Sequence, residues 1–305
     1  MVRKTVARDT LGNSKKPFGK KVCLSHCTNR LKKRQDGIWY SSKTDKVSYP
    51  AEGNEQCFGV EDNSFWFRHR NACILELVKR FPPLGKGPIF DVGGGNGFVA
   101  KSLVDDGWDV VLVEPGSTGA RNARKRGLQH VVCATTQTAG FRPGSMTAIG
   151  VFDVVEHIED DVGFLRHLHD VLKPSGMLYL TVPAYNFLWS DADVSAGHYR
   201  RYSLRDVNLK LREAGLTQVF GTYFFRILPL GVFLFRSLPF RMRTSNKRAS
   251  PEQLDRAHGT HDSVIIRVMR NMLKTEVKRI SEGRSMRFGA SCLVAATKPK
   301  QKKSD

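Results

Sequence analysis

The sequence IFDVGGGNGF, from Ile89 to Phe98, decides the fold of this chain. Its first four residues have the composition of a buried strand, and the glycine-rich part that follows leads into apolar residues at helical spacing. Glycines let a backbone turn sharply and approach a ligand closely, and the start of a helix offers unpaired N–H groups. The stretch therefore predicts a strand, a ligand-binding loop and a helix in succession.

Strand-like and helix-like patterns alternate on both sides of this loop. Apolar runs typical of strands lie at residues 88–92, 109–113, 130–133, 148–154, 177–182, 218–225 and 288–297. Amphipathic stretches lie at residues 65–81, 98–104, 118–126, 162–172 and 203–211. The alternation predicts an α/β protein with a seven-stranded, mostly parallel sheet and helices on both faces. Roughly 60 residues separate the last two strands, which is too many for a hairpin loop and predicts an insertion with structure of its own.

Charge divides the chain into parts. The net charge is +20, but residues 47–240 hold 20 basic and 20 acidic side chains, so the excess belongs to the two flanks. Ordinary globular composition excludes wholesale disorder and fibrous classes. We predict a flexible basic N-terminal arm over 1–50, a cofactor-binding core over 51–225, an apolar and basic insertion over 226–285, and the last core strand with a basic tail over 286–305.

The loop and the next strand together indicate the ligand. Seventeen residues after Gly97, the second strand ends at Glu114, where doubly wound sheets place an acid that binds ribose hydroxyls. Phe98 occupies the position at which a dinucleotide fingerprint requires glycine or alanine, and no Gly-Lys-Ser/Thr of a triphosphate loop is present. Asp91 would repel a phosphate but suits a cationic amino acid group. This combination favours S-adenosylmethionine (SAM).

Residues 64–182 resemble the class I SAM-dependent methyltransferases, particularly the small-molecule group that includes the quinone-biosynthesis O-methyltransferases. Four motifs carry the resemblance: DVGGGNG at 91–97, VLVEP at 111–115, FDVVEHIED at 152–160 and LKPSGMLYLTVPA at 172–184. It implies a Rossmann-like sheet whose last strand is antiparallel. It also implies candidate cofactor residues, with the methionine part at the glycine loop and the ribose at the second strand: Asp91, Gly93, Gly95, Gly97, Glu114 and Asp153. After the third strand the family often places an acid for the adenine amino group; residues 134–137 offer none, and Gln137 is the candidate in its place.

Two histidines follow strands at the edge where such sheets bind ligands, His157 after the fourth and His198 after the fifth. Methyl transfer needs the acceptor positioned in line with the methyl group, and a hydroxyl acceptor benefits from a base. We predict that His198 is this base, with His157 as a second catalytic candidate; a purely structural role for either is the alternative. The resemblance also implies that Asp153, Glu156 and His157 can hold a divalent ion such as Mg²⁺, against the alternative that Glu156 and His157 brace the crevice by hydrogen bonds.

Acceptor contacts are expected from two segments. Trp66 and Arg70 of the entry helix are placed to close over the site, and Arg200, Arg201 and Tyr202 lie in the long polar and aromatic loop after the fifth strand. The arginines suit a phosphate or carboxylate on the acceptor. The alternatives are solvated surface charges for the arginines and core packing for Trp66.

The insertion begins with the most apolar stretch of the chain, residues 223–236, which arginines bracket, and continues with an apolar helical face over 265–280. This composition is typical of an anionic membrane interface, and a lid with a homodimer surface is the alternative. No apolar run reaches the roughly 18 residues of a membrane-spanning helix. The six scattered cysteines and a polar start predict a cytoplasmic protein, peripheral at the inner face of a membrane.

The predicted function is therefore SAM-dependent methyl transfer to an oxygen of a small-molecule, glycan or lipid-linked acceptor. Two other classes stay open. An RNA methyltransferase would use the basic flanks on phosphates, although the Asn/Asp-Pro-Pro-Tyr/Phe signature of base methylation is absent and nucleic acid is not the expected partner. A noncatalytic SAM-binding partner protein is the third possibility.

Overall fold

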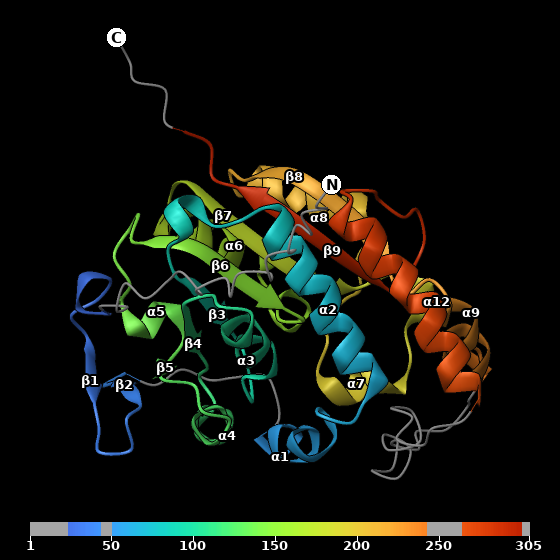
Figure 1. The fold of residues 1–305 in the computed structure, drawn as a ribbon, viewed down its shortest axis with the longest axis horizontal. Coiled ribbons are helices and arrows are strands. Elements are labelled where there is room, and N and C mark those ends of the chain that lie inside the picture. The colour runs from blue at the N-terminus through green and yellow to red at the C-terminus, as the bar shows by residue number, and fades with distance from the viewer. Residues whose placement is uncertain (1–23, 44–50, 243–263, 301–305) are drawn as a thin grey trace, which may run out of the picture.

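A computed structural model describes residues 24–43, 51–242 and 264–300 of the chain. Nine strands of these residues form one mixed sheet in the order β1-β2-β5-β4-β3-β6-β7-β9-β8 (Figure 1). Strands β2 to β7 run parallel, and β9 lies antiparallel between β7 and β8. The predicted α/β class, with a mostly parallel sheet and an antiparallel last strand, is confirmed. The strands are β1 Leu31–Lys33, β2 Trp39–Ser41, β3 Ile89–Val92, β4 Val110–Val113, β5 Val131–Cys133, β6 Met146–Phe152, β7 Leu172–Pro183, β8 Thr217–Phe224 and β9 Ser291–Thr297.

The two extra strands correct the predicted strand count and the predicted flexible arm. Strand β1 pairs with β2, and Trp39 and Tyr40 of β2 pair with the edge of β5. Leu24, Leu31 and Ile38 are buried, so this segment does bury apolar area. These side chains are too few and too irregularly spaced to give a strand pattern in the sequence. Residues 1–23 and 44–50 of the predicted arm lie outside the described residues.

Helices cover both faces of the sheet, as predicted. On one face pack α2 Phe65–Arg80, α3 Phe98–Asp105, α4 Ser117–Lys125 and α12 Val264–Ser281. Figure 1 shows α2, α3 and α12 in front of the sheet, with α6 Asp161–Val171 and α8 Leu204–Glu213 behind it. The short helix α5 Thr136–Ala139 packs on this second face as well. Both apolar layers are continuous across the central strands, because β3 and β4 are buried along their whole length.

The insertion between β8 and β9 divides into two parts with different surroundings. A helical run comprises α9 Leu228–Val232, a π-helical turn η5 Phe233–Ser237 and α10 Leu238–Met242, and α12 follows later in the chain. Leu273 and Ile280 of α12 are buried in the core layer beside α2. The apolar side of α12, which the sequence predicted to face a membrane, therefore belongs to the protein core. It covers part of the sheet face that α2 leaves open. The side chains of residues 264–270 lie outside the described residues.

A buried carboxylate fastens α12 to the end of β8. Glu276 accepts hydrogen bonds from the backbone N–H groups of Phe225 and Arg226, both at 2.8 Å, and its Oε2 lies 3.0 Å from Nε2 of His69 on α2. Phe225 has a left-handed backbone (φ +59°), so the chain turns sharply at this point. The contacts hold the first residues of the insertion against the entry helix.

Candidate active site

The glycine loop connects β3 to α3 at the carboxyl edge of the parallel strands. Gly93 has φ +71°, and a Cβ there would lie 2.7 Å from a methyl group of Val154. Gly97 has φ +77° and is the N-cap residue of α3. A side chain at either position would strain the backbone or collide with the next loop. The glycines are therefore required for the loop to pass this close to its neighbours.

Glu114, at the end of β4, joins two loops. Its Oε2 accepts a hydrogen bond from the Gly95 N–H at 2.9 Å, and its Oε1 accepts one from the Gly116 N–H at 2.7 Å. Burial raises the pKa of this carboxyl group to about 7, although both backbone donors oppose the shift. A carboxylate has about four acceptor positions, so room remains for ribose hydroxyls. Sequence analysis placed an acid here correctly but gave no sign of this bridging role.

Asp91 is the second buried acid of this region, and it is the third residue of β3, just before the glycine loop. It is 1% exposed, and no side chain of the described residues donates a hydrogen bond to either carboxylate oxygen. Burial raises its pKa to about 7; the charge of Arg70 lowers it and that of Glu114 raises it. A cationic ligand would compensate a carboxylate held in this way.

A polar network behind the loop was not predicted. Asn96 Nδ2 donates to the Asn54 carbonyl at 2.8 Å and to Glu61 Oε1 at 3.3 Å, and Asn122 Nδ2 donates to Asn96 Oδ1 at 3.0 Å. Asn54 lies on helix α1 Ala51–Val60, and Arg126 forms a 2.6 Å ion pair with Glu61. The network holds α1 against the loop. Its members are spread along 73 residues of sequence, so no spacing rule signals them.

Asp153, Arg70 and Trp66 form one packed group beside β6. Asp153 has φ +58°, and its Oδ1 accepts a hydrogen bond from Thr181 Oγ1 at 2.9 Å. Its Oδ2 forms a 3.1 Å ion pair with Arg70, whose guanidinium also lies over the Trp66 ring. Trp66 in turn stacks on Phe225 with ring centroids 5.5 Å apart. Trp66 and Arg70 thus both have partners within the protein, and their contact with an acceptor stays a prediction.

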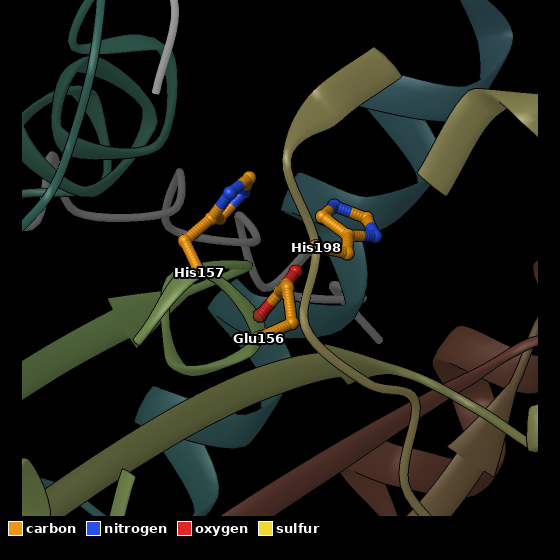
Figure 2. A group of neighbouring side chains, drawn as sticks. All are labelled: Glu156, His157 and His198. Carbon is orange, nitrogen blue, oxygen red and sulfur yellow. The ribbon is translucent and has the colours of Figure 1, made fainter. Parts of the chain in front are cut away.

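Two histidines and a glutamate from two loops come together at this edge (Figure 2). Glu156 and His157 lie in the η3 turn Val155–His157 after β6, and His198 follows helix α7 Asp191–Ala196. One side-chain ligand atom from each of the three lies within 4.8 Å of the others. The histidine rings meet edge to face with centroids 4.7 Å apart. Figure 2 shows the Glu156 carboxylate pointing toward the region between the two rings.

This cluster replaces the predicted metal group of Asp153, Glu156 and His157. Asp153 is occupied by Thr181 and Arg70, and His198 stands with the other two instead. The exchange could not be anticipated, because His198 comes from a loop 41 residues away. Burial, and then the charge of Asp153, raises the pKa of Glu156 well above its usual range. Burial and the neighbouring His198 lower the pKa of His157 to about 4, so its ring is neutral at physiological pH.

His198 is held from behind by Asp193, a residue that sequence analysis did not single out. Nδ1 of His198 lies 2.9 Å from Asp193 Oδ1, and Arg201 pairs with both oxygens of the same carboxylate. Burial alone would raise the pKa of Asp193, but the hydrogen bonds from His198 and Arg201 lower it to about 2. An ionised carboxylate only accepts, so Nδ1 of a neutral His198 carries the proton and Nε2 is its acceptor atom.

The other predicted acceptor contacts in this loop also have partners inside the protein. Arg200 donates to Asp161 Oδ2 at 2.8 Å, and the buried Tyr202 donates to the same oxygen at 2.9 Å. Arg201 is bound to Asp193. These three residues bind carboxylates of the protein that fix the loop over the end of β7, and their contact with an acceptor stays a prediction. Gln137 is exposed in the first turn of α5, after β5, and accepts a hydrogen bond from Thr136.

The sheet order and the glycine loop at its carboxyl edge define a nucleotide-binding α/β protein of the Rossmann-like type. A family model described as a methyltransferase domain matches residues 66–219, which are 154 of the 305 residues. The chain belongs to this family and is a class I SAM-dependent methyltransferase. The predicted class of enzyme is confirmed.

Relatives with assigned activities are distant. The ubiquinone biosynthesis O-methyltransferase of Xanthomonas euvesicatoria pv. vesicatoria is 26% identical over 117 residues, covering 36% of this chain and 49% of the relative. That of Xylella fastidiosa is 24% identical over 156 residues, covering 46% of this chain and 63% of the relative. The chain therefore spans about half to two thirds of the length of these relatives.

Solved structures share the fold. A possible histamine N-methyltransferase from Thermotoga maritima superimposes with a TM-score of 0.52 at 18% identity, covering 81% of this chain and 95% of that one. A putative methyltransferase in complex with the Haloferax volcanii Trm112 activator gives a TM-score of 0.52 at 15% identity, covering 83% and 95%. At this identity the likeness describes the fold alone.

Proposed function

We propose that this methyltransferase acts on an oxygen of a small-molecule acceptor and that His198 is the base that receives the acceptor proton. The arrangement of His198 on the ionised Asp193 carries the proposal, because it fixes the ring and leaves Nε2 to accept. The likeness to ubiquinone biosynthesis O-methyltransferases supports an oxygen acceptor. When bound, SAM supplies an electrophilic methyl group whose transfer breaks the carbon–sulfur bond and leaves a neutral thioether.

The residues of this chain divide the work in the proposal. Asp91 and Glu114 hold the cofactor at the glycine loop, where their buried carboxylates favour a cation and ribose hydroxyls. His198 takes the proton as the acceptor oxygen bonds to the methyl carbon. His157, neutral and edge-on to His198, limits the tilt of that ring and excludes water from one side of it.

A divalent cation is the second candidate use of the same cluster. One carboxylate and two imidazoles are a suitable donor set, and the buried Glu156 oxygens receive no hydrogen bond from a side chain of the described residues. Glu156, His157 and His198 would hold the ion and lower the charge cost of burying Glu156. A bound cation would occupy Nε2 of His198, the same atom that must accept the proton of the acceptor. His198 therefore cannot be metal ligand and base at once.

The decisive experiment measures transfer of radiolabelled methyl groups from SAM to aqueous and organic cell extracts by the wild-type protein and by His198→Ala. Transfer to a small acceptor that His198→Ala abolishes supports the proposal. Labelling confined to the RNA fraction would instead favour the nucleic-acid alternative. A chelator followed by Mg²⁺ separates base from metal ligand: loss and recovery of activity would assign the cluster to the ion, and unchanged activity would assign His198 to the proton.

Lipid-linked acceptors, a membrane location and a homodimer remain predictions for this chain. Among the described residues, no helix is both long and apolar enough to cross a membrane. The chemistry above applies equally to a glycan, a phenol or a lipid headgroup, since each presents a hydroxyl.

A further inference from the structure

The helical run over residues 228–242 has an apolar side that faces solvent. Five large apolar side chains are exposed on it: Leu230 (68%), Leu234 (44%), Phe235 (81%), Leu238 (36%) and Met242 (74%). Leu230, Leu234, Leu238 and Met242 recur every four residues, so they share one helix face. The opposite side holds the buried Pro229 and Ser237. An ordinary surface helix turns its apolar side toward the protein core, whereas this run turns its large apolar side chains toward solvent.

The π-helical turn in the middle of the run contributes to this face. The Leu238 N–H donates to the Phe233 carbonyl, five residues earlier, so the turn holds one residue more than an α-helical turn. The extra residue allows the adjacent Leu234 and Phe235 to be exposed together. Phe233 points the other way and meets Phe187 edge to face at 6.0 Å. The turn therefore concentrates the apolar area outside while the run stays packed on the protein.

Charge distinguishes between possible occupants of this face. No acidic residue occurs from Arg226 to Pro251, and the exposed Arg236 and Arg241 lie on the run itself. Apolar side chains flanked by arginines, with no acid among them, match the headgroup boundary of an anionic bilayer. Each basic residue near such a surface adds about 1 kcal/mol of attraction.

We infer that the run over residues 228–242 is a docking helix that lies on an anionic membrane surface. Leu230, Leu234, Phe235, Leu238 and Met242 enter the boundary between headgroups and acyl chains, and the positive charge of Arg236 and Arg241 favours an anionic surface. The run is 15 residues long, which suits lying on a bilayer and not crossing it.

The docking helix is connected to the candidate active site. Arg241 donates to the carbonyl of Phe187, whose ring stacks on Tyr185 with centroids 5.2 Å apart. Tyr185 begins the loop that carries His198. A docked enzyme would thus hold this loop close to the membrane, which favours an acceptor with a lipid anchor. This last consequence rests on the proposed function; the docking itself does not.

Vesicle sedimentation tests the docking without SAM or an acceptor, so its outcome is independent of the proposed chemistry. The full chain is mixed with vesicles of phosphatidylcholine and phosphatidylglycerol, or of phosphatidylcholine alone. We expect sedimentation with the anionic vesicles, weakened by salt, and about a tenfold or greater loss of binding in the Leu230→Ser/Phe235→Ser double variant. Leu209→Ser on α8 is the matched control, because Leu209 is an exposed leucine (54%) on another helix.

Three results would overturn the inference. The wild-type protein could stay in the supernatant with anionic vesicles, or the double variant could bind as well as the Leu209→Ser control. Light scattering could also give the mass of two copies for the wild type and of one copy for the double variant, which would make a second copy of the chain the occupant. Circular dichroism that matches the wild type shows that each variant is folded.

Discussion

Asp193, in the histidine half of the candidate active site, and the two acids of the glycine-loop half are buried carboxylates with opposite pKa shifts. In the loop around His198, Asp193 is paired with Arg201 and His198, and its pKa falls to about 2. In the glycine-loop half, Asp91 and Glu114 are also buried, no cationic side chain of the described residues forms an ion pair with either, and their pKa values rise to about 7. Asp193 is neutralised by side chains of the protein, whereas the glycine-loop half gains from a positively charged ligand. Glu156 of the histidine half resembles the glycine-loop acids, because burial raises its pKa well above the usual range.

This difference indicates which half responds to the cofactor and which is fixed in advance. A carboxylate that already pairs with side chains of the protein serves to position those side chains, because its charge is compensated before any ligand binds. A buried acid without such a partner favours any ligand that neutralises it. Binding and catalysis should therefore separate between the two halves when each is altered.

The largest expected effect is on the glycine-loop half. Glu114→Ala should weaken SAM binding by about a hundredfold or more. The two ribose hydroxyls of SAM lose a charged acceptor, and each such hydrogen bond is worth roughly 1.5 to 3 kcal/mol. The unfolding temperature should fall as well, since the Gly95 and Gly116 N–H groups lose their acceptor. Calorimetric titration measures the first effect and thermal unfolding the second.

Glu114→Gln is the control for this change. It keeps the size of the side chain and one acceptor oxygen, so only one of the two backbone N–H groups loses its acceptor. The unfolding temperature should therefore fall less than in Glu114→Ala, while SAM is still bound more weakly than by the wild type. Wild-type affinity in both variants would show that the carboxylate bridges the loops and has no part in holding the cofactor.

The histidine half should show the reverse pattern. His198→Ala is expected to lower the rate of methyl transfer by roughly a hundredfold, the usual cost of removing a general base, with SAM affinity nearly unchanged. Single-turnover kinetics and calorimetry on the same preparation separate the two quantities. A rate equal to that of the wild type would return His198 to a structural role.

Asp193 provides a finer test, because it acts through His198. Asp193→Asn should lower the rate by about tenfold with SAM affinity unchanged, because an amide no longer fixes the His198 tautomer in which Nε2 accepts. Arg201→Lys, which keeps a positive charge beside Asp193, should lower the rate less. Single-turnover kinetics measure both variants, and a wild-type rate in Asp193→Asn would mean that Asp193 only supports the loop.

The glycine-loop half was largely predictable from the sequence, and the histidine half was not. Asp91, the glycines and Glu114 fall within two adjacent strand–loop units, so local spacing brings them together. The grouping of Glu156 and His157 with His198 depends on how the loop after β7 folds back across β6. Short-range patterns carry no information about such a fold-back.

Four side chains have internal partners that the sequence did not reveal. Arg70, Arg200, Arg201 and Tyr202, which we predict to meet an acceptor, each have a carboxylate of the protein within hydrogen-bonding or ion-pairing distance. A sequence shows that an arginine is present but not which acid it will meet. The same limit hid the core role of α12, because an apolar helical stripe looks the same whether a membrane or a second helix covers it.

The smallest expected effect concerns pH, and it sharpens the comparison of the two halves. The pKa values of Asp91 and Glu114 are raised above those of an unfolded chain, so between about pH 4 and 7 the folded protein binds more protons and its free energy of unfolding falls as pH rises. A cationic cofactor favours the ionised acids, so SAM affinity should rise severalfold from about pH 6 to 8, with fewer than about two protons released on binding. Titrations in buffers of different ionisation enthalpy count those protons, and Asp91→Asn should reduce the count. If the count is zero in the wild type at pH 6.5, both acids are already ionised in the free protein, and the contrast between the two halves must then come from geometry and not from charge.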